Sequence, residues 1–168
     1  KFIKNLQMKQ PELNITDRLV LLVSLAGLCH DLGHLMFSHL FDDMFLKKLD
    51  NYDQLGDLVE HENRSIFLLN HIVKKNKINI NEKELLVIGD LINPKKNNYQ
   101  NWDKKFKVGK WIFEIISNPV NNIDVDKFDY IHRDNNAIGL KLNFDYSRLI
   151  KQARVINNNI CYPSQVQN

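Results

Sequence analysis

The chain has 168 residues, of which 43% are hydrophobic and 26% are charged, with a net charge of +3. This size and balance fit one ordinary globular domain and exclude a disordered chain, a collagen and a disulfide-stabilised miniprotein. No apolar run approaches the ~18 residues of a membrane span, and the charge alone is too small to indicate nucleic-acid binding. Because two cysteines make no disulfide framework and no address signal is visible, a cytoplasmic or nuclear location is the default expectation.

The apolar periodicity and the capping residues predict a mainly helical fold. The expected helices, in chain order, cover residues 18–30, 39–49, 57–75, 82–92, 111–117 and 125–137. Thr16 is a good N-cap for the first of them, Ser38 for the second and Asn81 for the fourth. Residues 95–105 are expected to form a polar surface loop, and residues 154–162 a small β-hairpin around an asparagine turn. The predicted fold class is therefore mainly α with a minor β element near the C-terminal end.

Ionisable residues are concentrated in the 13 residues that follow the first, very apolar helix. They are His30, Asp31, His34, His39 and Asp42. His30 and His34 are four residues apart and share a helical face. Asp31 could join His30 on one cation only where the helix ends or bends, which Gly33 permits. Imidazole and carboxylate ligands suit iron, manganese, magnesium or zinc, and burying such groups without partners or a metal is costly.

Two other interpretations of this segment stay open on spacing alone. The histidines could be core residues with satisfied hydrogen bonds. His30 and His34 could also be the pair of a helical zinc protease, although that motif uses Glu at the second position and has no glycine inside the helix. Asp31 and Gly33 therefore disfavour a protease.

A second group lies on the expected helix over residues 125–137. Asp126, Tyr130 and Asp134 are spaced by four and share one stripe, and Lys127 is compatible with it. For Asp126 the spacing leaves a functional and a purely structural role equally open. Its neighbours Asp124 and Asp129 are better read as helix-dipole or surface charges, and the pair His61–Glu62 alone is typical of an exposed turn.

Four blocks of the sequence carry a resemblance to a known family. They are Lys9–Leu13, Leu25–His34, Phe37–His39 and Ile123–Tyr130. In this order they resemble the HD-domain metal-dependent phosphohydrolases, and within these the deoxynucleoside triphosphate triphosphohydrolases. The resemblance extends over about Lys9 to Cys161 and implies an HD-domain helical bundle, with residues 1–168 as a single, partial HD domain. Leu35–Met36 depart from the Gly-Pro of a relative, so the turn before Phe37 is expected to differ in shape.

The resemblance also implies roles for individual residues. The expected metal ligands are His30, Asp31 and Asp126. A fourth ligand, a histidine, is expected upstream of Lys1, because no His precedes His30. The expected catalytic residues are His34, His39, Asp42 and His61, with Asp42 orienting His39. The expected substrate-binding residues are Lys127, Tyr130 and Asp134, which would hold the phosphates and the sugar.

The function that the resemblance implies is metal-dependent hydrolysis of deoxynucleoside triphosphates to deoxynucleoside and inorganic triphosphate. The expected cofactor is a divalent metal ion (Fe, Mn, Mg or Zn), and the expected partners are the substrate, a nucleotide activator and further copies of the chain. One alternative is an HD phosphohydrolase of another nucleotide, either a monophosphate or a cyclic one. A different class of function is a non-catalytic module that binds nucleotides or nucleic acid.

Overall fold

The structure, a computed structural model, describes residues 1–94, 108–141 and 145–163. The predicted polar loop at residues 95–105 lies outside the described residues. The chain divides into two compact units, unit 1 with Lys1–Ser24 and Lys95–Asn168, and unit 2 with Leu25–Pro94. The single HD domain expected over residues 1–168 stays a prediction.

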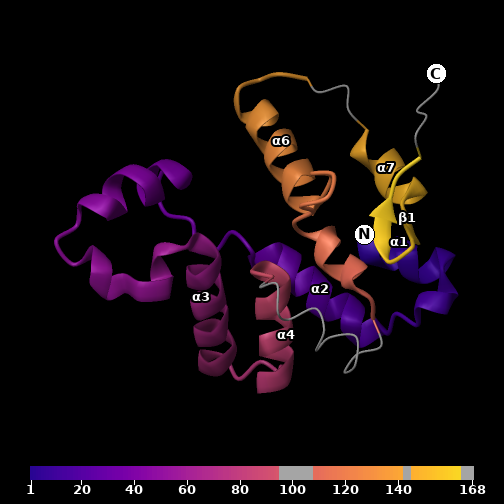
Figure 1. Cartoon of the computed structure of the whole chain (residues 1–168), viewed down its shortest axis with the longest axis horizontal. Coiled ribbons are helices and arrows are strands. Elements are labelled where there is room, and N and C mark those ends of the chain that lie inside the picture. Colours follow the sequence, from indigo (N-terminus) through magenta and orange to yellow (C-terminus); the bar gives the residue numbers. More distant parts are fainter. Residues whose placement is uncertain (95–107, 142–144, 164–168) are drawn as a thin grey trace. The chain divides into compact units, whose positions relative to one another are not determined.

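The fold class is mainly α with a small C-terminal hairpin, as predicted (Figure 1). The α-helices are α1 (Phe2–Lys9), α2 (Asp17–Cys29), α3 (His61–Lys75), α4 (Glu82–Ile92), α6 (Val125–Ala137) and α7 (Tyr146–Gln152). The 3₁₀ segments are η1 (Pro11–Leu13), η3 (Leu46–Lys48), η4 (Tyr52–Val59) and η5 (Lys110–Ile115), and η2 (Phe41–Phe45) is a π-turn. The strands are β1 (Arg154–Ile156) and β2 (Asn159–Cys161), paired antiparallel. Among the described residues, no helix is both long and apolar enough to cross a membrane.

The helix α2 begins and ends close to its predicted bounds. The Thr16 hydroxyl accepts a hydrogen bond from the backbone N–H of Leu19 (3.1 Å), so Thr16 caps the helix as expected. The α2 residues of the buried core are Leu19, Val20, Leu22, Val23, Ala26 and Cys29. The helix α2 therefore serves mainly to form the core. The ionisable residues of the candidate site begin only after its last residue, Cys29.

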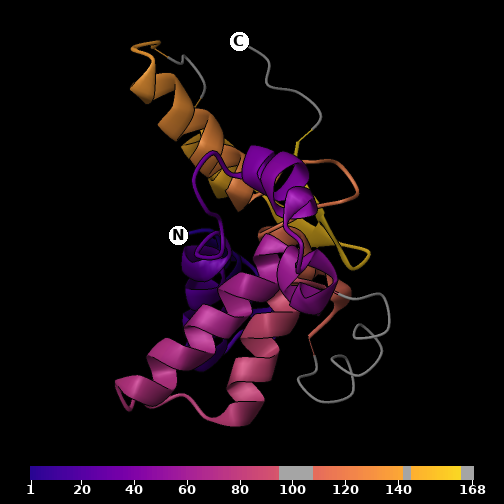
Figure 2. The same ribbon diagram turned by 90° about the vertical axis from the view of Figure 1, so that its left-hand side faces the viewer.

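In unit 2, α3 and α4 lie side by side (Figures 1 and 2). The helix α4 has the predicted bounds because Asn81 and Glu84 form a capping box with two 3.0 Å hydrogen bonds. The helix α3 begins at His61 rather than at residue 57. Gly56 has φ +50° and Glu60 is extended, so no α-helix can run through them.

The segment between α2 and α3 differs from the predicted helix over residues 39–49. Residues 39–48 are helical throughout, but two α-helical residues lead into the π-turn η2 and the 3₁₀ turn η3, so the span is not one regular α-helix. The chain enters it through two consecutive left-handed residues, Phe37 (φ 65°) and Ser38 (φ 49°). Ser38 makes no side-chain cap; its carbonyl accepts from the N–H of Phe41 (3.0 Å). The helical residues end before Leu49, whose extended backbone (ψ 136°) stops the helix.

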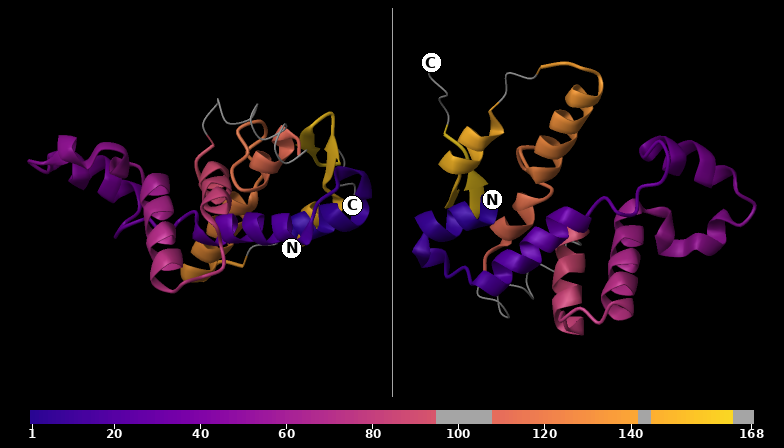
Figure 3. Two further views of the ribbon diagram at one scale, coloured as in Figure 1. Left: turned by 90° about the horizontal axis from the view of Figure 1, so that it is seen from below. Right: turned by 180° about the vertical axis from the view of Figure 1, so that it is seen from behind.

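In unit 1, α1 packs against α7 and the hairpin packs against η5 (Figure 3). The Asn5 amide donates to the Ile150 carbonyl (2.7 Å), and the backbone N–H of Ile160 donates to the Glu114 carboxylate (2.7 Å). The hairpin turns at Asn157 and Asn158, both left-handed (φ 49° and 61°), as a two-residue asparagine turn requires. The expected helix over 111–117 is instead the 3₁₀ segment η5, whose residues Trp111–Ile115 are all buried.

Candidate active site

The His-Asp pair lies in the turn directly after α2. The His30 Nδ1–H donates to the Gly27 carbonyl (2.9 Å), which leaves Nε2 with its lone pair in the neutral ring. That Nε2 lies 3.2 Å from Oδ1 of Asp31. Two acceptor atoms this close repel unless a cation or a proton lies between them. A histidine whose second nitrogen bonds a carbonyl is the usual arrangement of a metal ligand, so the donor set fits a divalent ion.

Gly33 and Ser65 hold this turn against α3. The Gly33 N–H donates to the Ser65 hydroxyl (2.8 Å), which also lies 2.6 Å from the His30 carbonyl oxygen and 2.9 Å from that of His61. A Cβ atom at Gly33 would lie 2.0 Å from the His61 carbonyl oxygen and 2.6 Å from the Ser65 nitrogen. Glycine is therefore required here for close approach of two backbones, and not only to end a helix. Ser65 is fully buried, and sequence reasoning missed it.

All four predicted catalytic residues come together in unit 2. We call His34, His39, Asp42 and His61 the histidine cluster; one ligand atom of each lies within 4.8 Å of the others. The rings of His34 and His61 stack with centroids 3.9 Å apart, and the His39 ring stands edge-on to both, at 4.9 and 5.2 Å. The structure thus groups the four residues, while their catalytic roles stay predictions.

Burial and charge act in opposite directions on the histidine cluster. Burial of His34 lowers its pKa, the nearby imidazoles of His61 and His39 lower it further, and the carboxylates of Asp31 and Asp42 raise it in part. The His34 ring is therefore mainly uncharged at neutral pH. Its Nδ1 is buried and makes no hydrogen bond within the described parts of the chain.

Carboxylates flank the third ring of the cluster. Nδ1 of His61 lies 3.8 Å from Oδ2 of Asp42 and 3.3 Å from Oε2 of Glu62. These contacts place Asp42 beside His61, whereas the prediction that Asp42 orients His39 stays open. The other oxygen of Asp42 bonds Arg64, on the same helix as His61. Sequence reasoning missed Arg64, because a charged residue in the first turn of an amphipathic helix looks like part of its solvated face.

The remaining predicted residues lie on α6 in unit 1. Asp126 is in the first turn, and Lys127, Tyr130 and Asp134 follow it along the helix. Asp126 therefore belongs to unit 1, and its membership of one metal site with His30 and Asp31 stays a prediction.

Asp124 and Asp129 make the contacts expected of a charge at a helix N-terminus and of a surface charge. Asp124 caps α6 by accepting from the N–H of Lys127 (2.8 Å), and it also accepts from the N–H of Asn118 (2.8 Å). Asp129 forms an exposed ion pair with Arg133 (2.6 Å).

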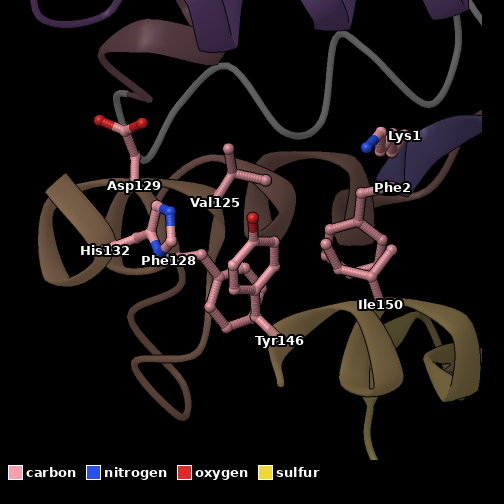
Figure 4. A pocket seen from close by; sticks show the side chains of 8 residues that line it. All are labelled: Lys1, Phe2, Val125, Phe128, Asp129, His132, Tyr146 and Ile150. Atoms are coloured by element: carbon pink, nitrogen blue, oxygen red, sulfur yellow. The ribbon is translucent and has the colours of Figure 1, made fainter. Parts of the chain in front are cut away.

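An aromatic pocket lies elsewhere in unit 1 (Figure 4). Its lining includes Phe2, Phe128, His132 and Tyr146, with Asp129 at its edge. Tyr146 stacks on Phe128 (centroids 5.8 Å apart) and meets His132 edge-on (5.9 Å). None of the predicted site residues lines this pocket.

Known proteins are similar to almost the whole chain. Deoxynucleoside triphosphate triphosphohydrolase SAMHD1 of Mus musculus is 37% identical over an alignment of 166 residues, gaps included, which covers 91% of this chain and 25% of the relative. The SAMHD1 homologue of Dictyostelium discoideum is 36% identical over an alignment of 168 residues, which covers 98% of this chain and 30% of the relative. An HD domain-containing protein of Acanthamoeba polyphaga mimivirus is 35% identical over an alignment of 161 residues, which covers 95% of this chain and 32% of the relative. No family model matches the chain.

The chain spans a quarter to a third of the length of these curated relatives. The identity extends over nearly all of the chain rather than over a short motif. It therefore covers both the His-Asp turn and the helix α6. The chain is a homologue of the deoxynucleoside triphosphate triphosphohydrolases and corresponds to a segment of their HD core.

Proposed function

We propose that this chain is part of a metal-dependent phosphohydrolase that converts deoxynucleoside triphosphates to deoxynucleosides and inorganic triphosphate. The observation that carries the proposal is the histidine cluster, held beside the His30–Asp31 turn by Gly33 and Ser65. Three imidazoles and a carboxylate in one place serve phosphate binding and proton transfer better than they serve packing. The relatives named for this activity support the choice of substrate.

His30, Asp31 and Asp126 are the proposed protein ligands of the ion. The hydrogen bond from His30 to Gly27 supports this, because it fixes the ring with Nε2 beside the Asp31 carboxylate. A divalent ion bound there would lower the pKa of a water molecule and neutralise phosphate charge. Iron, manganese, magnesium and zinc all accept an imidazole and carboxylate set, so the donor types do not select one of them.

The histidine cluster is proposed to act on the phosphate ester. In the reaction a water oxygen bonds the α-phosphorus, the bond from phosphorus to the 5′ oxygen breaks, and that oxygen takes a proton. His39 is exposed and His61 is flanked by two carboxylates, and these two rings are the proposed sources of the proton. His34, whose ring is uncharged at neutral pH, is better suited to a hydrogen bond with a phosphate oxygen than to carrying charge.

The helix α6 is proposed to bind the rest of the substrate. Lys127 would hold the triphosphate by charge, while Tyr130 and Asp134, one and two turns beyond Asp126, would contact the sugar. Their spacing supports this, because residues four apart present one stripe of the helix to a ligand. Assembly into homo-oligomers, control by an activating nucleotide and binding of nucleic acid are further proposals, and so is a cytoplasmic or nuclear location.

The test uses the complete gene product that carries this chain. The protein is incubated with each deoxynucleoside triphosphate and Mn²⁺ or Mg²⁺, with and without GTP, and the products are separated by chromatography. We expect deoxynucleoside and intact triphosphate. An Asp126→Ala variant should lose more than ~100-fold of the activity, since even the loss of an outer partner of a metal ligand costs 10–100-fold.

The matched control is Asp129→Ala, which removes an exposed carboxylate from the same helix. It should keep the activity within about twofold, as surface substitutions away from special features usually change little. Metal binding without triphosphate release would favour another HD substrate, a nucleoside monophosphate or a cyclic nucleotide. Nucleotide binding that leaves every substrate intact would favour a non-catalytic sensor.

A further inference from the structure

The guanidinium of Arg64 has an unusual number of partners for a residue near the start of a helix. Its Nε–H donates to the Gly33 carbonyl (2.8 Å) and its Nη1 to the carbonyls of Leu58 (2.8 Å) and Val59 (2.9 Å). Its Nη2 donates to Oδ1 of Asp42 (2.5 Å). The side chain is 13% exposed, so these bonds form largely out of water. Arg64 therefore joins three separate segments of unit 2 at one point on α3.

Asp42 depends on this contact for its position. It lies in the π-turn η2, where no continuous α-helix fixes the backbone. One of its oxygens is bound by Arg64, and the other faces Nδ1 of His61 at 3.8 Å. The charge-assisted hydrogen bond from Arg64 therefore holds one oxygen of the carboxylate and leaves the other on the side of His61.

The same contact distinguishes between two uses of the histidine cluster. A carboxylate already bound by a guanidinium is a poor ligand for a second cation, because the ion would approach a fixed positive charge. The pairing of Asp42 with Arg64 therefore favours an orienting role for this carboxylate over a metal-binding one.

We infer that Arg64 is a positioning residue, which acts on the reaction by holding Asp42 toward His61. The inference rests on the proposed function, but the contacts themselves do not. Lysine could not replace arginine here, because a single ammonium cannot span a carboxylate and carbonyls on three segments.

Steady-state kinetics of the complete gene product test the inference with the variants Arg64→Met, Arg64→Lys and Asp42→Asn. We expect Arg64→Met to lower kcat at least ~30-fold while KM changes less than ~3-fold, since Arg64 is proposed to act on geometry and not on substrate binding. Arg64→Lys should be intermediate. The exposed pair of Lys47 with Asp43 in the same segment (3.1 Å) provides the control, and Lys47→Met should keep wild-type kcat.

A double-mutant cycle distinguishes positioning from general structural support. If Arg64 acts through Asp42, Arg64→Met should have little additional effect on kcat in an Asp42→Asn background. Losses that multiply in the double variant would overturn the inference, and so would an Arg64→Met enzyme with wild-type kcat. If Arg64→Met does not fold, as judged by circular dichroism, the cycle is run with Arg64→Lys and the same criteria.

A second readout keeps this inference separate from the proposed reaction. Ring ¹H and ¹⁵N signals of His61 are recorded by NMR in the wild type, in Arg64→Lys and in Lys47→Met. A shift in Arg64→Lys alone, with the backbone spectrum preserved, supports positioning even if the wild type hydrolyses no deoxynucleotide. Unchanged His61 signals in Arg64→Lys contradict it, whatever the substrate proves to be.

Discussion

The amide nitrogen of Gly33 lies 2.8 Å from the hydroxyl oxygen of Ser65, and this bond joins the turn after α2 to the first half of α3. The same hydroxyl lies within donating distance of the carbonyls of His30 and His61. One buried oxygen thus connects the His-Asp turn to the helix that carries part of the histidine cluster. The geometry of the site therefore depends on residues without catalytic chemistry of their own.

Replacing Ser65 with alanine should destabilise the protein by about 2 kcal/mol, because it leaves the buried Gly33 N–H without its acceptor. Urea unfolding, followed by circular dichroism, measures the change. The control is Ser24→Ala. Ser24 is exposed, and its hydroxyl donates to the Val20 carbonyl one turn earlier in the same helix (2.7 Å). That variant should stay within about 0.5 kcal/mol of the wild type. Equal losses in the two variants would show that the Ser65 contact has no special weight.

Gly33→Ala should be more damaging, because the added methyl group would lie only 2.0 Å from the His61 carbonyl oxygen. We expect a loss of about 3 kcal/mol, at the upper end of the range for overpacking. Gly89→Ala is the matched comparison. Gly89 lies inside α4, and its added Cβ would make an ordinary van der Waals contact of 3.6 Å with the Ile66 side chain on α3. It should raise stability by up to ~1 kcal/mol through helix propensity. A Gly33→Ala protein as stable as the wild type would refute the close approach.

The buried carboxyl of Glu114 makes stability depend on pH in a defined direction. Burial raises its pKa above the ordinary value, while the Ile160 N–H and Lys110 oppose the rise. The folded state therefore holds the proton more tightly than the unfolded one, and the free energy of unfolding falls as pH rises from the unfolded pKa through the folded one. Glu114→Gln keeps an acceptor for Ile160 without the charge.

That variant should accordingly exceed the wild type in stability at pH 7, and the difference should shrink as pH falls toward the ordinary glutamic acid range. Urea unfolding of both proteins between pH 4.5 and about 8 gives the comparison. A difference that grows on acidification would mean that the folded state prefers the ionised carboxylate.

Removing the capping box of α4 should have a moderate effect. Asn81→Ala loses the acceptor for the Glu84 N–H and should lower stability by about 1 kcal/mol. The control is Lys83→Ala, which changes an exposed residue in the same helical turn. This variant should leave the stability close to that of the wild type. Thermal unfolding of the two variants is sufficient, and indistinguishable midpoints would show that the cap contributes nothing measurable.

The sequence predicted best those elements whose ends are determined locally. The bounds of α4 follow from a cap at Asn81 and a stop at Asn93–Pro94, all within the segment itself. The helical span predicted over residues 39–49 is present, but it is a π-turn and a 3₁₀ turn instead of a regular α-helix, and its contact with Arg64 lies too far along the chain for a local pattern to show. The helix α1 was missed for a related reason: Lys1 offers no side-chain cap, and the Asn5 contact that ties α1 to Ile150 is long-range.

The same distinction applies to the site. Spacing alone indicated that His30 and Asp31 could share a cation, and the turn after α2 has a geometry that fits one. That His61 lies with His34 came from the family resemblance, because no local pattern relates residues so far apart. Ser65 and Arg64 gave no signal, since a serine and an arginine in a helix are equally compatible with exposure to water.

The left-handed backbone at Phe37 and Ser38 has a consequence for how such a protein can change. Each of these side chains disfavours its conformation by about 1–2 kcal/mol, and glycine would remove that penalty. Selection for heat resistance alone would therefore favour glycine at these two positions. It would also loosen the loop that presents His39, so the variants that survive the highest temperature should be among the slowest catalysts.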